Sequence, residues 1–342
     1  MRRLVLLLLL APSFCLAQPP PGYYDTAWGL SGEPLRVALY DIISPHTVLL
    51  YNQLWNAFSR TDRKVDNTVW DIYSDVPGGT PPYVYQFVTD QCGTYDSEGD
   101  CFNREHSFPI SWFNDVPPMN TDLFHIYPTD GWVNAQRGSW PYGTVNAPTY
   151  TSDNGGERGP CSWPGCTGTV FEPIDAYKGD LARGYFYMLT RYMNESVGWP
   201  APILSGGEFF SWTESLLLAW HAADPVSQKE LARNDSIFLI QGNRNPYIDN
   251  PQWVYSIWGP LAGMSEELAA QARVWYANEQ LIIVRHGQQD LLPVEVIDAT
   301  GRTVLTTTVN GDRTVLPFDA THGMYVALIG KSPERLAVRF VR

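Results

Sequence analysis

The sequence predicts an α+β fold in two parts, a mainly helical domain followed by a small all-β sandwich. Apolar residues recur at helical spacing in several segments before residue 260. After Glu279 the pattern changes to short alternating strands separated by turn residues, as in a β-sandwich. Between the predicted helices, residues 103–142 concentrate polar and ionisable side chains. The 342 residues are enough for one large core and an added module.

Each helical segment is expected from an apolar repeat or from a capping residue. Ser31 can cap a helix that carries Leu35, Leu39 and Ile43 on one face. Asp130 can cap a short helix that follows it. Further helices are expected near residues 48–58, 180–192, 213–223 and 226–234, strands over 69–73 and 83–88, and a long surface loop over 146–169.

The first residues resemble a targeting segment. Residues 1–17 contain two arginines, a run of leucines and a small residue, Ala17, at the expected cleavage point of a secretory signal peptide. No later segment has the roughly 18 unbroken apolar residues that a membrane helix needs. We therefore expect an exported, soluble protein with no integral membrane segment. Its predicted parts are a signal peptide at 1–17, a main domain at 18–278 and a β-sandwich at 279–342.

The cysteines agree with export. Four remain after Ala17, in two close sequence pairs, Cys92 with Cys101 and Cys161 with Cys166. An even number in an exported chain favours the disulfides Cys92–Cys101 and Cys161–Cys166, although three pairings are formally possible. The alternative is a metal site, but neither spacing is the two-residue spacing common in such sites.

The charge balance points away from a polyanion as partner. The formal net charge is −13, whereas proteins that bind polyanions usually carry a basic face. Net charge describes solubility and long-range steering rather than a site, so a few local arginines and a metal could still make a cationic cleft.

A cluster of ligand-type side chains lies within residues 103–137. The carboxylate of Glu105 can hold a hard divalent metal, and His106 beside it can act as a base. Asn134 offers an amide oxygen as a second ligand of the kind that Mg²⁺ accepts. Arg104 and Arg137 could bind phosphate on either side. Together these residues indicate metal-assisted hydrolysis of a phosphodiester.

Spacing places these residues relative to one another. Asp130, Asn134 and Arg137 fall at positions i, i+4 and i+7 of the predicted short helix, so they share one face. Glu105 and His106 are neighbours, which on a regular strand point to opposite faces. An in-line attack on phosphorus needs a base on one side and a metal on the other, so this separation suits the reaction.

Several separated blocks of the sequence resemble the bacterial extracellular endonuclease I family. They are residues 104–106, 122–130, 133–134, 137–138, 172–173, 178–188 and 241–249. The resemblance covers roughly residues 23–260. Its specificity comes from the number and order of the blocks, because the Arg-Glu-His run of residues 104–106 alone would be weak.

The resemblance implies a fold and a mechanism. That family belongs to the His-Me finger (ββα-metal) nucleases, which cleave DNA and often RNA with little sequence preference. It implies His106 as general base and Glu105 and Asn134 as ligands of one ion, Mg²⁺ or alternatively Ca²⁺ or Mn²⁺, with 5′-phosphate products. Arg137 is expected to contact phosphate as a catalytic residue. The weaker candidates for substrate binding or for support of the site are Arg104, His125, Asp130, Arg183 and Arg244.

One departure from the family pattern is visible. Family members commonly have His where this chain has Phe124, and His or Asn at the next position, where this chain has His125. His125 is expected to keep the supporting hydrogen bond, whereas Phe124 cannot make one.

The C-terminal part resembles the β-sandwich sorting domains of the type IX secretion system. The similar residues are 294–302, 323–326 and the basic end at 339–342. This resemblance implies the export machinery as a partner and a secreted or cell-surface location.

Two other functions remain open from the sequence. A phosphodiesterase of smaller substrates could use the same metal site, although a second carboxylate–histidine cluster, which two-metal phosphatases need, is not evident. A cell-surface binding protein with an inactive enzyme-like domain would fit the change at Phe124 and the acidic charge.

Overall fold

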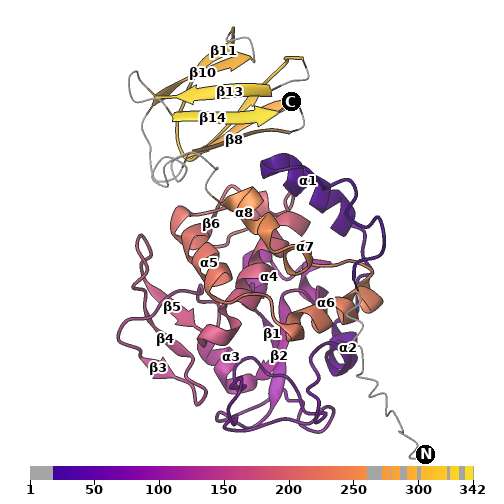
Figure 1. The fold of residues 1–342 in the computed structure, drawn as a ribbon. Coiled ribbons are helices and arrows are strands. Elements are labelled where there is room, and N and C mark those ends of the chain that lie inside the picture. Colours follow the sequence, from indigo (N-terminus) through magenta and orange to yellow (C-terminus); the bar gives the residue numbers. More distant parts are fainter. Residues whose placement is uncertain are drawn as a thin grey trace, which may run out of the picture.

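The computed structural model describes residues 18–259, 272–277, 279–285, 291–298, 302–321, 324–330 and 336–341. The predicted signal peptide at 1–17 lies outside the described residues. Helices and sheets are both present, and they confirm the α+β class. Figure 1 shows a larger helical part and a separate β part, with the helix α1 lying between the rest of the helical part and the strands.

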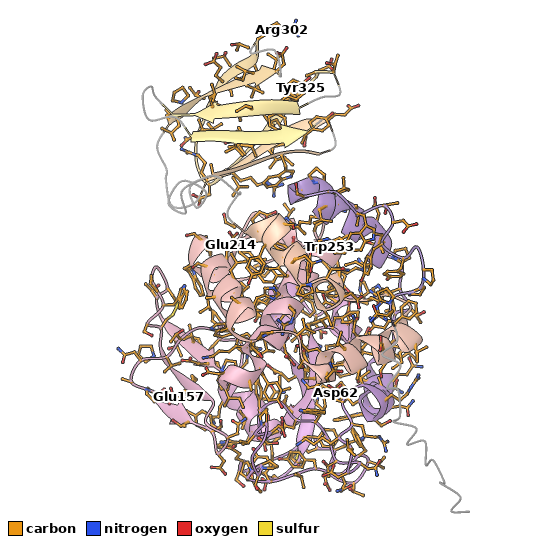
Figure 2. The ribbon with its side chains drawn as sticks, viewed as in Figure 1. Asp62, Glu157, Glu214, Trp253, Arg302 and Tyr325 are labelled. Atoms are coloured by element: carbon orange, nitrogen blue, oxygen red, sulfur yellow. A yellow bond between two sulfur atoms is a disulfide. The ribbon has the colours of Figure 1, made fainter. Side chains whose placement is uncertain are left out.

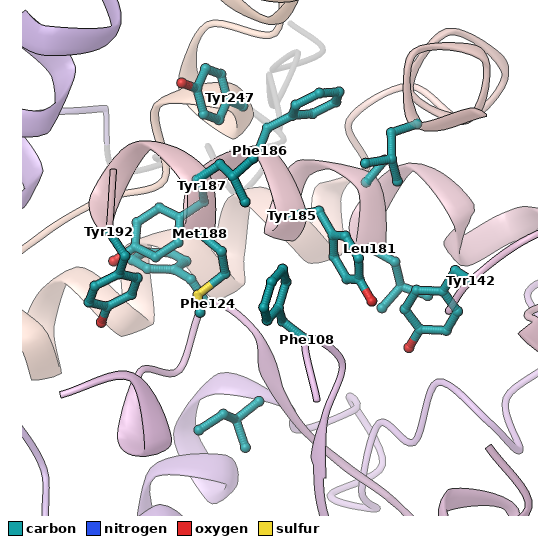
Figure 3. Close-up of a cluster of buried hydrophobic side chains, with 14 of the residues drawn as sticks. Phe108, Phe124, Tyr142, Leu181, Tyr185, Phe186, Tyr187, Met188, Tyr192 and Tyr247 are labelled. Carbon is teal, nitrogen blue, oxygen red and sulfur yellow. The ribbon is translucent and has the colours of Figure 1, made fainter. Parts of the chain in front are cut away.

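The helical part is organised around one buried helix. Its helices are α1 (Gly32–Ile43), α2 (Leu54–Thr61), α3 (Gly131–Arg137), α4 (Lys178–Arg191), α5 (Ser211–Ala223), α6 (Gln228–Gln241), α7 (Pro246–Asp249) and α8 (Gln252–Trp258). Every residue of α4 from Gly179 to Arg191 is buried, so the helix has no solvent face. A helix that is enclosed on all sides belongs to a core. Figure 3 shows its side chains, among them Leu181, Tyr185 and Met188, spread along the core.

Three small antiparallel sheets belong to this part. The pair that matters for the site is β1 (Phe102–His106) with β2 (Ile126–Asp130), and α3 follows β2 directly. The other sheets are β3 (Tyr150–Thr151), β4 (Glu157–Pro160) and β5 (Thr169–Glu172), and β6 (Leu204–Ser205) with β7 (Glu208–Phe209). The chain order of the first unit is therefore strand, strand, helix.

Most predicted helices are present, but three expectations, two strands and one loop, are wrong. The strands expected over 69–73 and 83–88 are absent; a single bridge joins Thr68 to Gln86. The Asp71 side chain accepts a hydrogen bond from the backbone N–H of Tyr73, and this local bond competes with a strand ladder over residues 69–73. The loop expected over 146–169 contains β3 and β4, and the helix expected over 226–234 continues to Gln241.

Both expected disulfides are present. Cys92 is bonded to Cys101, next to the start of β1, and Cys161 is bonded to Cys166, between β4 and β5. Among the described residues, no helix is long and apolar enough to cross a membrane.

The C-terminal strands form two sheets around one core. A four-stranded sheet has the order β11 (Thr303–Val309), β10 (Leu292–Asp298), β13 (Met324–Ile329), β14 (Leu336–Val341). A three-stranded sheet has the order β12 (Arg313–Pro317), β9 (Gln280–Arg285), β8 (Ala272–Ala277). Buried residues of both sheets, such as Ile283 and Val296, share one cluster, and Figure 2 shows Tyr325 in this part. This is the expected β-sandwich arrangement.

The paired strands begin before the predicted boundary at residue 279. β8 pairs with β9 over its whole length. The composition change near Glu279 did not reveal β8, because this strand lacks the turn residues and the aliphatic run that mark the later strands.

A buried ion pair joins α6 to α2 and β2. Arg233 Nε donates to Asp62 Oδ1 at 2.8 Å, and Arg233 Nη2 donates to the carbonyls of Leu123 and Ile126, both at 2.7 Å. Arg233 and Asp62 are both buried. The pair therefore holds the segment that leads into β2.

Arg233→Ala should lower the free energy of unfolding by about 3–5 kcal/mol, because it leaves the Asp62 carboxylate buried without its partner. Urea denaturation at neutral pH measures the change. The control is Arg63→Ala, which removes an exposed arginine and should change stability by less than about 0.5 kcal/mol. Equal stabilities of the two variants would contradict the importance of the pair.

Candidate active site

β1 presents its side chains alternately to two environments. It pairs with β2 in the register Glu105 to Tyr127 and His106 to Ile126. Glu105 contacts Tyr73 and Arg137, whereas His106 lies beside Tyr51 and His125. The two neighbours therefore have separate surroundings, as strand geometry requires.

His106 is held as a neutral imidazole with one defined tautomer. Its Nε2 lies 3.1 Å from the backbone oxygen of Asn120. A carbonyl oxygen only accepts, so Nε2 carries the hydrogen and Nδ1 is the basic nitrogen. Burial, and then the nearby His125, lowers the pKa of His106 to about 3. The free base is thus the form present at neutral pH.

Glu105 is a buried carboxylate with one oxygen engaged. Its Oε1 accepts from the Tyr73 hydroxyl at 2.9 Å and lies 3.0 Å from Arg137 Nη1. Burial raises the pKa of Glu105, and the Arg137 charge opposes that rise. Both contacts end on Oε1, so Oε2 is the oxygen available to a further ligand.

Asn134 is oriented by its amide nitrogen. Nδ2 donates to Asn103 Oδ1 at 2.6 Å and to the backbone oxygen of Arg104 at 3.3 Å. The amide oxygen is therefore directed away from these two partners. Because α3 packs against β1, Asn134 reaches the backbone beside Glu105, and Arg137, one turn later, reaches Glu105 itself.

The oxygens of Glu105 and Asn134 fit a hard divalent ion. Carboxylate and amide oxygens suit Mg²⁺, which keeps several waters and is often held by only one or two protein groups. Among the described residues, no group of three or more His, Cys, Asp or Glu side chains forms a closed metal cage.

The structure gives Arg137 a different role from the expected phosphate contact. Its side chain is 1 % exposed. Nη1 donates to the His106 carbonyl at 2.9 Å, and Nη2 donates to the carbonyl of Ser107 and to the hydroxyl of Tyr185. These contacts fix the end of β1 and the position of Glu105. Arg137 therefore acts as a positioning residue, since its buried guanidinium bonds the end of β1 and pairs with Glu105.

Two other arginine candidates also lie in buried ion pairs. Arg183 donates to both carboxylate oxygens of Glu230, at 2.5 and 2.8 Å. Arg244 donates to Asp249 at 2.7 Å and to Asp235 at 2.8 Å. Both side chains are buried, and these contacts join helices of the core. Both arginines are therefore engaged in ion pairs of the core, and a role for them in substrate binding or in support of the site stays a prediction.

Asp130 and His125, the candidates for support of the site, make contacts closer to the expected ones. Asp130 caps α3, since its Oδ1 accepts from Val133 N–H at 2.7 Å. His125 Nε2 donates to the Met119 carbonyl at 2.7 Å, and its ring centroid lies 5.6 Å from that of His106. Burial lowers the pKa of His125 to about 4, so this ring is neutral as well. Phe124 packs on Tyr187 in the core, as Figure 3 shows, and does not face His106.

Arg104 is the candidate arginine that remains partly exposed at this strand. Its guanidinium carbon lies 4.0 Å from the ring centroid of Tyr51 and 4.4 Å from that of Trp55. Nη1 donates to the Tyr51 carbonyl at 3.2 Å. The Tyr51 ring is nearly parallel to the His106 ring, with centroids 6.2 Å apart and planes at 11°.

Comparison with known proteins shows the family of the chain. A family model described as Endonuclease I matches residues 31–252, a span that includes the hairpin and α3. The chain belongs to the endonuclease I family.

Relatives of this endonuclease I chain include two enzymes named as ribonucleases and one named as a deoxyribonuclease. It is 36% identical over 249 residues to an extracellular ribonuclease of Bacillus amyloliquefaciens, covering 69% of this chain and 78% of that protein. It is 34% identical over 250 residues to the extracellular ribonuclease of Bacillus subtilis (strain 168), with the same coverages. An extracellular deoxyribonuclease of Aeromonas hydrophila is 26% identical over 133 residues, which are 38% of this chain and 50% of that protein.

Four residues of this endonuclease I site were missed by the sequence interpretation. Tyr73 bonds Glu105, Asn103 orients Asn134, the Asn120 carbonyl sets the His106 tautomer, and Tyr51 stacks beside His106. Asn103 could have been found from the sequence, because it stands two residues before Glu105 and residues at that spacing share one face of a strand. The others are distant in sequence, and their types have no special chemistry without the fold.

Arg137→Ala should lower the free energy of unfolding by about 3–5 kcal/mol, because Glu105 then lies buried without a cationic partner. Arg104→Ala removes an arginine of β1 that has no carboxylate partner among the described residues, and should cost less than about 1 kcal/mol. Chemical denaturation compares the two. An Arg137→Ala protein as stable as the unmodified chain would contradict the positioning role.

Proposed function

We propose that this chain is a secreted endonuclease that hydrolyses phosphodiester bonds in RNA and DNA with little sequence preference. The reaction uses one divalent ion, Mg²⁺ or alternatively Ca²⁺ or Mn²⁺, held by Glu105 and Asn134, and leaves 5′-phosphate ends. The strand–strand–helix unit is then a His-Me finger. The observation that carries the proposal is a neutral His106 with a fixed tautomer beside a carboxylate and an oriented amide.

The chemistry of His106 follows from its hydrogen bond. Nδ1 takes a proton from the attacking water, and the positive charge that forms on the ring is stabilised by the bond from Nε2–H to the Asn120 carbonyl. The ring cannot turn to offer Nε2 without losing that bond. The packed rings of His125 and Phe113 fix its plane.

Glu105 and Asn134 act on the other side of the strand. Tyr73 and Arg137 hold the Glu105 carboxylate, and Asn103 holds the Asn134 amide, so the two ligand oxygens are oriented before substrate binds. When bound there, a divalent ion supplies charge neutralisation for the phosphoryl oxygens and for the leaving oxygen.

The extracellular setting is part of the proposal. The two Bacillus relatives and the Aeromonas relative are named as extracellular enzymes, which supports export of this chain. We assign residues 1–17 to a signal peptide and the C-terminal sandwich to a sorting domain that the export machinery recognises, with release to the medium or retention at the cell surface. The two disulfides suit an oxidising compartment.

His106→Ala should reduce cleavage of supercoiled plasmid and of RNA by about 10²–10⁴-fold in the presence of Mg²⁺, as expected for loss of a general base. Glu105→Gln should be similarly impaired, and EDTA should abolish cleavage by the unmodified protein. The control is His46→Ala, which changes a histidine bonded to Ser44 and Arg191 outside the site. Folded protein that cleaves neither substrate with Mg²⁺, Mn²⁺ or Ca²⁺ would overturn the proposed function.

A further inference from the structure

We propose that Arg104, held between the rings of Tyr51 and Trp55, binds the phosphate next to the one that is cleaved. The inference rests on the proposed function and names one contact that the substrate makes. It assigns the phosphate anchor to Arg104 rather than to Arg137.

Strand geometry places Arg104 beside the reacting group. Arg104 and His106 are two residues apart on β1, so their side chains leave the same face of the strand. Two residues of a strand span about 6.6 Å. That span is of the order of the distance between successive phosphates of an extended nucleic acid strand. A phosphodiester at Nδ1 of His106 therefore has its neighbouring phosphate near Arg104.

The guanidinium is oriented but has donors left for a ligand. The two rings lie 4.0 and 4.4 Å from its carbon, and one N–H is used by the Tyr51 carbonyl. No carboxylate among the described residues forms an ion pair with Arg104. Its remaining N–H groups make no hydrogen bond within the described residues, and a phosphate can accept two hydrogen bonds from one guanidinium.

The other arginines near the hairpin do not compete for this role. Arg137 is buried and donates to backbone carbonyls, and Arg233 is buried and paired with Asp62. Tyr51, in contrast, is 42 % exposed, so the stack lies at the surface. A substrate can reach Arg104 without any change in the core.

The stack also explains why an arginine rather than a lysine stands here. A planar guanidinium lies flat between two rings, whereas an ammonium is a point charge that needs no such slot. Tyr51 contacts both the Arg104 guanidinium and the nearly parallel His106 ring, so a phosphate bound at Arg104 has a defined position relative to the His106 imidazole.

The test is the salt dependence of binding, measured on full-length protein that carries His106→Ala so that the probe is not cut. A fluorescent single-stranded oligodeoxynucleotide is titrated over a series of KCl concentrations. Adding Arg104→Ala should weaken binding about tenfold at low salt. It should also reduce the slope of log Kd against log salt by about 0.7, the value for one lost phosphate contact.

Two variants separate this role from a general loss of structure. Arg104→Lys keeps the charge, so the slope should stay close to that of the parent while affinity falls by less. Arg63→Ala removes another surface arginine that lies over an aromatic ring, Phe87, and should change neither quantity. An unchanged slope in Arg104→Ala would overturn the proposal, and so would an equal loss of slope in Arg63→Ala.

Substrate length gives a second, independent measurement in protein with His106 intact. Arg104→Ala should lower kcat/KM about tenfold on a long oligonucleotide. On bis(p-nitrophenyl) phosphate, which has a single phosphate, it should leave kcat/KM unchanged. An equal loss on both substrates would place Arg104 on the cleaved phosphate or on His106 and overturn the assignment. If the unmodified protein cleaves neither substrate, the proposed nuclease function fails, whereas the binding slopes still decide the role of Arg104.

Discussion

The alternation of side chains along β1 is the constraint on which the site depends. Glu105 and His106 are adjacent, and antiparallel pairing with β2 forces them to opposite faces. Each face then needs its own support. On one side Tyr73 and Arg137 hold the carboxylate; on the other the Asn120 carbonyl and the ring of His125 hold the imidazole. A strand shifted by one residue would exchange the two environments and bury the imidazole beside Arg137.

Arginines in this protein mainly serve the fold. Arg137, Arg183, Arg233 and Arg244 are buried, and each bonds a carboxylate; the partners of the first three come from segments distant in the sequence. A guanidinium suits this task because it stays charged and presents several donors in one plane. Burial of a charge is costly, so such pairs need complete hydrogen bonding. In Arg137 the two terminal nitrogens are bonded, since they pair with Glu105 and donate to the carbonyls at the end of β1, whereas Nε has no partner among the described residues.

The sequence could predict the features that depend on near neighbours. The helix after Ser31, the cap at Asp130 and the two disulfides follow from spacing and residue type, and the structure contains all of them. The strand expected over 69–73 is absent, and there the Asp71 side chain bonds the nearby backbone N–H of Tyr73 instead. The structure offers no such reason for the absence of the strand over 83–88.

At the site, the sequence alone could not predict the roles of the two arginines. Arginine in a motif next to a metal ligand suggests a phosphate contact, and Arg104 and Arg137 are equivalent on that criterion. Their difference arises from what surrounds them: Arg137 on α3 faces the end of β1, whereas Arg104 lies between two rings from the segment at 51–55. These partners are separated from the arginines by tens of residues. No spacing rule within the motif contains that information.

The acidic charge of the chain and a polyanionic substrate are compatible on physical grounds. The formal net charge of −13 is a sum over the whole molecule, whereas screening limits surface charges to about 10 Å at 0.1 M salt. Buried arginines have their charge cancelled by partners and add little to the field outside. The electrostatic potential that acts on a phosphate near β1 therefore depends on Arg104, which has no such partner among the described residues. It also depends on any ion that Glu105 and Asn134 hold. A protein can be acidic in total and cationic over the few ångströms where a strand of nucleic acid lies.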